Sequence, residues 1–167
     1  MRKKFFKVVI VAIALVGGFS AYAQKGEMAA GANVVVGSFT DSKNSMDFGV
    51  GARFMYNVSD PIRLDGSFNY YFGASAPLDF SVNAHYLINV MPKLNVYPLV
   101  GLSIYAFGDD DDWDDDDYST ETVAGGLGLN LGGGAEYQIT DKIWGNAEIK
   151  YNVGMGFAAS VGVAYKF

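Results

Sequence analysis

Residues 157–167, FAASVGVAYKF, set the pattern by which the rest of the sequence is interpreted. Every second residue from Phe157 to Phe167 is apolar, and the residues between them are small or polar. Because successive side chains of a β-strand point to opposite faces, this alternation predicts a strand with one apolar face.

The same alternation extends back through the chain. It predicts strands at 27–38, 48–58, 62–72, 78–88, 94–105, 126–139, 143–153 and 157–167. The first is the least regular, since Val35 lies among its polar positions. Strands of about ten residues cross a bilayer when tilted by about 45°. The sequence therefore predicts an all-β fold, an eight-stranded antiparallel transmembrane up-and-down β-barrel.

The connections between these strands alternate in length. Tight turns are expected at 59–61, 89–93 and 140–142, whereas the other connections are 39–45, 73–77, the long 107–124 and a short link at 154–156. Outer-membrane barrels have an even number of strands, with the tight turns facing the periplasm. The connection at 107–124 is therefore expected outside the cell.

A soluble sandwich or a lipocalin-like barrel is the alternative interpretation of this alternation of apolar and polar residues. Such folds turn the apolar face inward and carry many charges outside. Here the polar faces hold mainly Gly, Ser and Asn with few charges, which suits a narrow lumen. Aromatic residues also gather near the strand ends, as in interfacial girdles: Phe48, Phe72, Phe80 and Phe157 at one end, and Tyr56, Tyr86, Tyr137 and Tyr165 at the other. The pattern favours the outer membrane of a Gram-negative bacterium.

The N-terminus has the features of a targeting segment. A basic head with Arg2 and Lys7 precedes the apolar residues 8–19, and Ala21-Tyr22-Ala23 is typical of a signal-peptidase site. We expect residues 1–23 to be a cleaved signal peptide and residues 24–167 to be the barrel domain. A membrane anchor is the alternative, but residues 8–19 are too short to cross as a helix.

Charge and cysteine content exclude several classes of function. Removal of residues 1–23 takes away four of the 12 basic residues and none of the 18 acidic ones, which changes the formal net charge from −6 to −10. This charge argues against nucleic acid as a partner. The chain has no Cys, which excludes disulfides, thiolate metal sites and a lipoprotein anchor.

Several charged residues occupy the polar faces of the predicted strands and are expected in the lumen. We expect a balanced, hydrogen-bonded plug, because unpaired charges in so narrow a barrel would be costly. A gated pore in which the ion pairs exchange partners is the alternative. The predicted lumen charge network comprises Arg53, Arg63, Asp65, Asp79, His85, Glu136, Glu148 and Lys150, with Lys166 as a further cation.

The alternating strands and the closing segment 161–167, VGVAYKF, resemble small bacterial outer-membrane barrels related to outer-membrane protein X and the transmembrane domain of outer-membrane protein A. The resemblance implies contact with outer-membrane lipid and lipopolysaccharide. It also implies that Tyr165 and Phe167 form a signal for the barrel-assembly machinery. Some barrels of this size are lipid-modifying enzymes that use His and Ser at the outer leaflet. His85 is the only histidine here and is expected to point inward near a periplasmic turn, so we expect no enzyme activity.

The segment at 109–117 is an acidic run interrupted by Trp113. Its carboxylates are Asp109, Asp110, Asp111, Asp112, Asp114, Asp115, Asp116 and Asp117. They repel one another and are hard ligands that suit weak Ca²⁺ binding, although the EF-hand pattern is absent. We expect a diffuse polyanionic loop that binds Ca²⁺ weakly or is only a solvated spacer. No other cofactor is expected, and a basic extracellular partner would suit the charge.

The sequence as a whole predicts a non-enzymatic outer-membrane protein with a structural or interaction role at the cell surface. The alternative function is a narrow, porin-like conduit for small solutes or lipids.

Overall fold

The computed structural model describes residues 25–39, 46–72, 78–106 and 125–167. Nine strands form one antiparallel sheet. Their bounds are β1 Met28–Phe39, β2 Asp47–Ser59, β3 Ile62–Phe72, β4 Leu78–Tyr86, β5 Ile88–Met91, β6 Leu94–Ala106, β7 Gly125–Gln138, β8 Ile143–Asn152 and β9 Gly156–Lys166. Among these described residues, no helix is long and apolar enough to cross a membrane.

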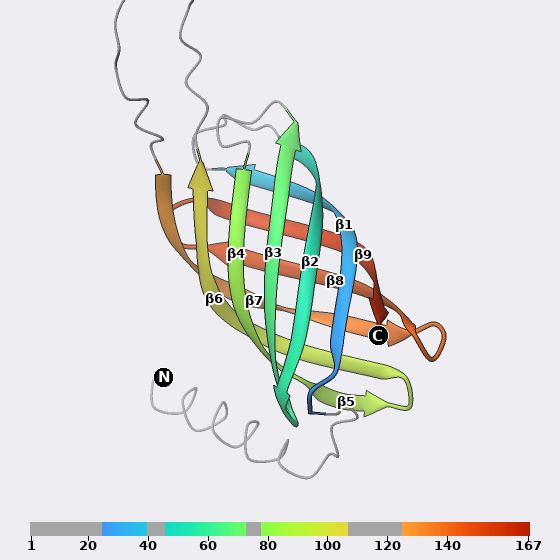
Figure 1. Ribbon diagram of the computed structural model, residues 1–167. Coiled ribbons are helices and arrows are strands. Elements are labelled where there is room, and N and C mark those ends of the chain that lie inside the picture. The colour runs from blue at the N-terminus through green and yellow to red at the C-terminus, as the bar shows by residue number, and fades with distance from the viewer. Residues whose placement is uncertain (1–24, 40–45, 73–77, 107–124) are drawn as a thin grey trace, which may run out of the picture.

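The sheet closes on itself. Strand β1 pairs with both β2 and β9, and β4 pairs with β6. Because β5 follows β4 and pairs with the start of β6, the two short strands together complete one side of the barrel. Figure 1 shows the strands wrapped around a common axis. The predicted eight-stranded antiparallel barrel is therefore confirmed.

The predicted strand at 78–88 is interrupted at Leu87. Leu87 is 2% exposed, and its backbone N–H continues the pairing on the β3 side by donating to the carbonyl of Pro61 at 2.8 Å. On the other side, the register of β4 with β6 places Tyr86 opposite Pro98, which has no N–H to donate, and the pairing with β6 is interrupted there. Strand pairing then resumes in β5 and continues to Met91. The turn predicted at 89–93 is consequently reduced to Pro92 and Lys93, where Lys93 adopts a φ of 77°.

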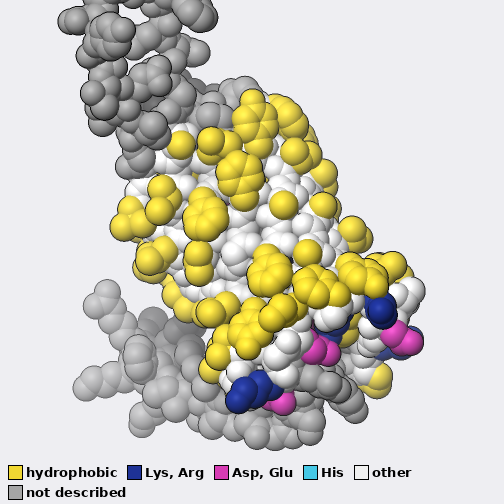
Figure 2. All heavy atoms as spheres, viewed as in Figure 1, with side chains coloured by type: hydrophobic (Ala, Val, Ile, Leu, Met, Phe, Trp, Pro, Cys, Tyr) yellow, Lys and Arg dark blue, Asp and Glu magenta, His cyan; other side chains and the backbone are white. Residues whose placement is uncertain are grey.

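The outer surface is apolar. Leu127, Phe157 and Val161 are 71%, 58% and 55% exposed, although each belongs to a regular strand. On the face seen in Figure 2, hydrophobic side chains cover the barrel wall, and charged side chains lie at the end that carries β5. An apolar surface of this kind is stable in contact with lipid. Closure of the sheet also pairs the backbone groups of the first and last strands, which would otherwise be exposed to hydrocarbon.

The interior of the barrel is polar, whereas the core of a soluble protein is apolar. Asp65, Asp79, Ser81, Ser103 and Asn130 are completely buried inside the barrel. We call the barrel end opposite the tight turns the loop end, and there the polar interior is followed by a small apolar cluster. This cluster comprises Val35, Tyr71, Tyr105 and Ala158, with Met155 packed against it. Val35, the exception to the alternation in the first predicted strand, thus contributes to an apolar cap on the lumen.

The inward face of β7 is rich in glycine because side chains from neighbouring strands cross it. A Cβ at Gly134 would lie 2.6 Å from the ring of Tyr97, and one at Gly128 would lie 2.0 Å from the Asn152 carboxamide. Since real Cβ atoms do not approach so closely, glycine at these positions leaves room for the side chains that fill the lumen.

Candidate functional site in the barrel lumen

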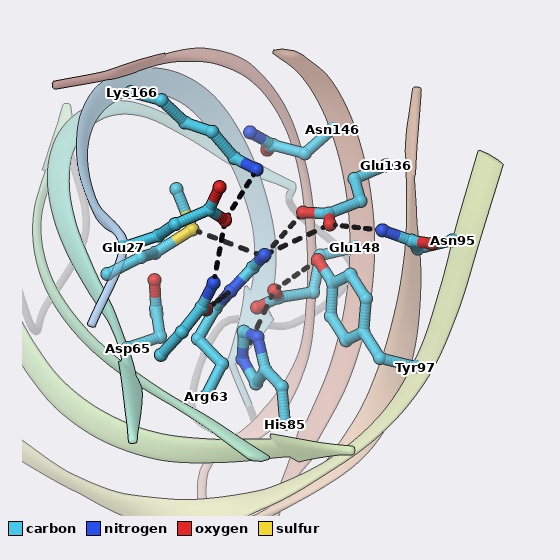
Figure 3. Close-up of polar contacts among 12 residues, drawn as sticks. Glu27, Arg63, Asp65, His85, Asn95, Tyr97, Glu136, Asn146, Glu148 and Lys166 are labelled. Atoms are coloured by element: carbon cyan, nitrogen blue, oxygen red, sulfur yellow. Dashed lines mark hydrogen bonds and ion pairs between the residues drawn. The ribbon is translucent and has the colours of Figure 1, made fainter. Parts of the chain in front are cut away.

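The charged side chains of the lumen form three layers along the barrel axis. On β3, Arg63, Asp65 and Asn69 face inward in order from the tight-turn end towards the loop end, and Glu148 and Lys150 follow the same direction on β8. We call the layers the end layer (Glu27, Arg63, Glu136, Lys166), the middle layer (Arg53, Asp65, His85, Glu148) and the loop-side layer (Asp79, Lys150). Figure 3 shows the end layer together with Asp65, His85 and Glu148 of the middle layer.

In the end layer, Arg63 crosses from β3 to Glu136 on β7. Both terminal guanidinium nitrogens of Arg63 donate to the Glu136 carboxylate, in an arrangement with two parallel bonds. Asn95 also donates to Glu136, at 2.9 Å, and Arg63 Nε donates to Asn57 at 2.8 Å. Nearer the mouth, Lys166 pairs with Glu27 at 2.8 Å and lies over the Trp144 ring.

In the middle layer, Arg53 uses all three guanidinium nitrogens. Nε donates to Asp65 Oδ2 at 2.9 Å, Nη1 to Asn146 Oδ1 at 3.0 Å and Nη2 to Glu148 Oε2 at 3.0 Å. The hydroxyl of Tyr97 donates to the same Glu148 oxygen at 3.1 Å.

His85 completes the middle layer. Its ring stacks on Tyr97 with a centroid separation of 4.4 Å, and its Nε2 lies 3.9 Å from Glu148 Oε2. The side chain is 1% exposed. Within the described part of the chain, neither imidazole nitrogen has a hydrogen-bond partner.

In the loop-side layer, Lys150 crosses from β8 to β4. Its ammonium donates to Asp79 at 3.0 Å and to Ser81 at 2.8 Å. Ser81 continues the chain of hydrogen bonds through Ser103 to Asn130. This layer is therefore held by one ion pair surrounded by neutral polar groups.

The structure places all eight residues of the predicted lumen network on the inward face, and each is buried or nearly so. It pairs Arg53 with both Asp65 and Glu148, Arg63 with Glu136, and Lys150 with Asp79. Lys166 lies at the mouth rather than deep in the lumen. Tyr165 and Phe167 lie at the tight-turn end of β9 and are 47% and 66% exposed.

The acidic run at 109–117 lies outside the described residues, as does the predicted signal peptide at 1–23. Within the four described ranges, no group of three or more His, Cys, Asp or Glu side chains is placed to hold a metal ion.

Sequence reasoning missed the neutral partners and one acid. Asn57, Asn95 and Asn146 bind the two arginines or Glu136, and Glu27 binds Lys166. The signal was present for the asparagines, because they recur at inward-facing positions of the alternating pattern. Glu27 is the first residue of the strand predicted at 27–38, the least regular one, and it has the same phase as the inward-facing Asn33.

The layers leave little free space. A cavity of about 20 Å³ lies beside Arg53, Glu148 and Lys150, and another of about 10 Å³ lies beside Arg63 and Glu136. Each is close to the space of a single water molecule. A wider vestibule of about 350 Å³ opens at the tight-turn end, lined by Lys93, Asp141 and Trp144 among others. Among the residues that the structure describes, the lumen is therefore largely filled, and a recessed mouth opens at the tight-turn end.

Comparisons with solved structures show the same architecture in other proteins. A de novo designed transmembrane β-barrel is 21% identical, with a TM-score of 0.60, over 87% of this chain and 98% of the designed one. The N-terminal β-barrel domain of Pseudomonas aeruginosa OprF is 16% identical, with a TM-score of 0.60, over 86% of this chain and 100% of the domain. Ail, the attachment invasion locus protein of Yersinia pestis, is 14% identical, with a TM-score of 0.57, over 86% of this chain and 100% of Ail. No curated protein matches the chain.

The family comparison extends from the fold to the cellular location. Residues 11–167 match the family described as the outer membrane protein beta-barrel domain. Together with the apolar outer surface, this match confirms the predicted outer-membrane location and the expected resemblance to small outer-membrane barrels. The chain therefore belongs to the family of outer membrane protein β-barrel domains.

Proposed function

We propose that this protein has a structural or interaction role at the cell surface, supported by a barrel whose lumen is plugged. The observation that carries the proposal is Arg53, which joins β2 to acceptors on β3 and β8. Arg63 and Lys150 cross the lumen in the same way at either side of it. Ions could pass only if these buried pairs separated, which would leave charges unpaired at low dielectric.

The alternative, a narrow conduit for small solutes or lipids, requires a second arrangement of these pairs. The vestibule at the tight-turn end gives access only as far as the end layer, where Arg63 and Glu136 are joined by two hydrogen bonds. The apolar cap of Tyr71 and Tyr105 opposes passage at the other end. We therefore favour the plug, and conductance measurements distinguish the two functions.

The proposed role is non-enzymatic. His85 is the only imidazole in the chain, and it is enclosed between Tyr97 and the carboxylate of Glu148. With 1% of its surface exposed, it cannot meet a substrate at the outer leaflet. A general base must lie within hydrogen-bond reach of the proton that it abstracts.

The proposed interaction surface includes the acidic run at 109–117. In sequence it lies between β6 and β7, and the flanking residues Ala106 and Gly125 are at the barrel end opposite the tight turns. Tight turns of outer-membrane barrels face the periplasm, so we place this connection outside the cell. Ail of Yersinia pestis has been solved with the heparin analogue sucrose octasulfate, a polyanion. A polyanion would be repelled by 109–117, so the partner proposed for this chain is cationic.

Binding of a cationic probe tests the proposed interaction surface. Poly-lysine should bind phosphatidylcholine vesicles that contain the protein, and added NaCl should release it because exposed charges are screened. Replacing all eight Asp residues of 109–117 by Asn should abolish binding. The control replaces Asp60 and Asp141, at the opposite end, by Asn. Equal binding by the control and the eightfold variant would exclude 109–117 as the cationic-partner surface.

The same segment supports a second prediction. We expect millimolar Ca²⁺ to change the fluorescence of Trp113, because carboxylates on both sides of the indole attract the cation. The eightfold Asp-to-Asn variant should lose this response and remain folded. Trp144 is buried in the lumen and gives a constant background. If intact protein shows no Ca²⁺ response by fluorescence or calorimetry, the segment is a solvated spacer.

A further inference from the structure

The three lumen layers differ in charge balance. The end layer contains two cations and two carboxylates, and the loop-side layer contains Lys150 and Asp79. Both layers are neutral. The middle layer contains one cation, Arg53, against the two carboxylates of Asp65 and Glu148. With a neutral imidazole at His85, the middle layer therefore carries one excess negative charge.

This excess charge is buried. The side chains of Asp65 and Glu148 are 0% and 8% exposed. Arg53 contacts only one oxygen of Asp65, and Asp65 Oδ1 has no hydrogen-bond partner within the described residues. A buried carboxylate charge that is not fully compensated is costly, so the middle layer has a strong tendency to bind a cation.

We propose that the middle layer is a buried proton-binding site, in which His85 takes up one proton on acidification and closes onto Glu148. The small cavity beside Glu148, about 20 Å³, has room for little more than one water molecule. A proton on an existing side chain adds charge without needing space. Binding it makes the middle layer neutral, as the other two layers already are.

His85 is the acceptor because of the geometry around the carboxylates. Glu148 Oε2 already accepts hydrogen bonds from Arg53 and Tyr97, and Asp65 Oδ2 accepts one from Arg53. Both of these oxygens are therefore already engaged by donors. Both imidazole nitrogens of His85 lack partners among the described residues, and Nε2 is already within 3.9 Å of Glu148 Oε2. A modest movement of the ring would convert this approach into a charge-assisted hydrogen bond.

Charged groups from four strands surround the ring of His85. Arg53 on β2 and Arg63 on β3 would repel a proton on the ring, whereas Asp65 on β3 and Glu148 on β8 would attract it. Glu136 on β7 compensates Arg63, and Tyr97 on β6 stacks on the ring. A proton on His85 therefore gives Glu148 a second cationic partner beside Arg53 and tightens the middle layer of the plug.

The single histidine makes the test direct. The imidazole carbon chemical shifts of untagged protein in detergent micelles report only His85. Between pH 8 and pH 5, the proposal predicts a change from the neutral to the cationic ring. Glu148→Gln and Asp65→Asn each remove one negative charge, so each makes the layer neutral without a proton. In both variants the ring should stay neutral down to pH 5.

A matched control separates charge balance from a general effect of substitution. Glu27→Gln changes an acid of the end layer, and its His85 should titrate as in the wild type. Each variant is first shown to be folded by its heat-modifiable migration in gels, and Asp65→Asn suffices if Glu148→Gln does not fold. A wild-type ring that remains neutral at pH 5 would overturn the proposal. So would a ring that titrates in a folded charge-removing variant at the same pH as in the wild type.

Discussion

Replacing Arg53 by alanine is expected to lower the free energy of unfolding by about 3–5 kcal/mol, the range typical of breaking a buried ion pair. The guanidinium donates three hydrogen bonds, to Asp65, Asn146 and Glu148. Without it, the carboxylates of Asp65 and Glu148 are buried together with no cation in their layer. Urea titration of the barrel in lipid vesicles, followed by heat-modifiable migration, measures the change.

The control for Arg53→Ala is Lys142→Ala, which removes a cation at the exposed tight turn between β7 and β8. The side chain of Lys142 contacts Tyr165, and this contact is exposed. Exposed charge pairs contribute about 0–1 kcal/mol, so this variant should remain near the wild type. If Arg53→Ala and Lys142→Ala have the same unfolding midpoint as the wild type, the lumen pairs do not hold the barrel together.

Deleting Phe167 is expected to remove most of the assembled barrel from outer membranes. The Phe167 N–H donates to the carbonyl of Met28 at 3.2 Å, at the junction where β9 meets β1 and closes the sheet. Its ring lies 6.4 Å from that of Phe54, on the outer surface. An open seam would expose unpaired backbone groups to lipid, which is strongly unfavourable.

Phe167→Tyr is the matched variant for the deletion, because it retains the backbone donor and an aromatic ring. We expect it to assemble in nearly normal amounts. Quantifying heat-modifiable protein in isolated outer membranes compares the two. Normal recovery of the barrel after deletion of Phe167 would refute the proposed assembly signal at Tyr165 and Phe167.

The strands could be predicted from the sequence because lipid and a narrow lumen impose opposite requirements on alternate residues. Val161 and Ser160 are adjacent in sequence and face opposite environments, and the same contrast is repeated along every predicted strand. The break at Leu87 could not be predicted in this way. It lies where the register of the folded sheet places Pro98 of β6, which has no N–H to donate, opposite Tyr86.

The lumen residues could also be predicted, whereas their partners could not. Alternation shows that Arg63 and Glu136 both face inward, but it does not show that they meet across the barrel. That pairing depends on the closure of the sheet and on the stagger between β3 and β7. Tyr71 and Tyr105 illustrate the same limit, because only the three-dimensional arrangement brings them together with Val35 as an apolar cap.

The central claim is that the lumen is plugged, and single-channel recording in planar bilayers tests it most directly. The wild-type protein should insert without producing discrete current steps, because Arg53, Arg63 and Lys150 each cross the lumen to a carboxylate. Glu148→Ala leaves Arg53 with only the neutral Asn146 as a partner on β8, and we expect it to show a leak. Discrete current steps from folded wild-type protein, growing with salt concentration, would contradict the plug and support a conduit.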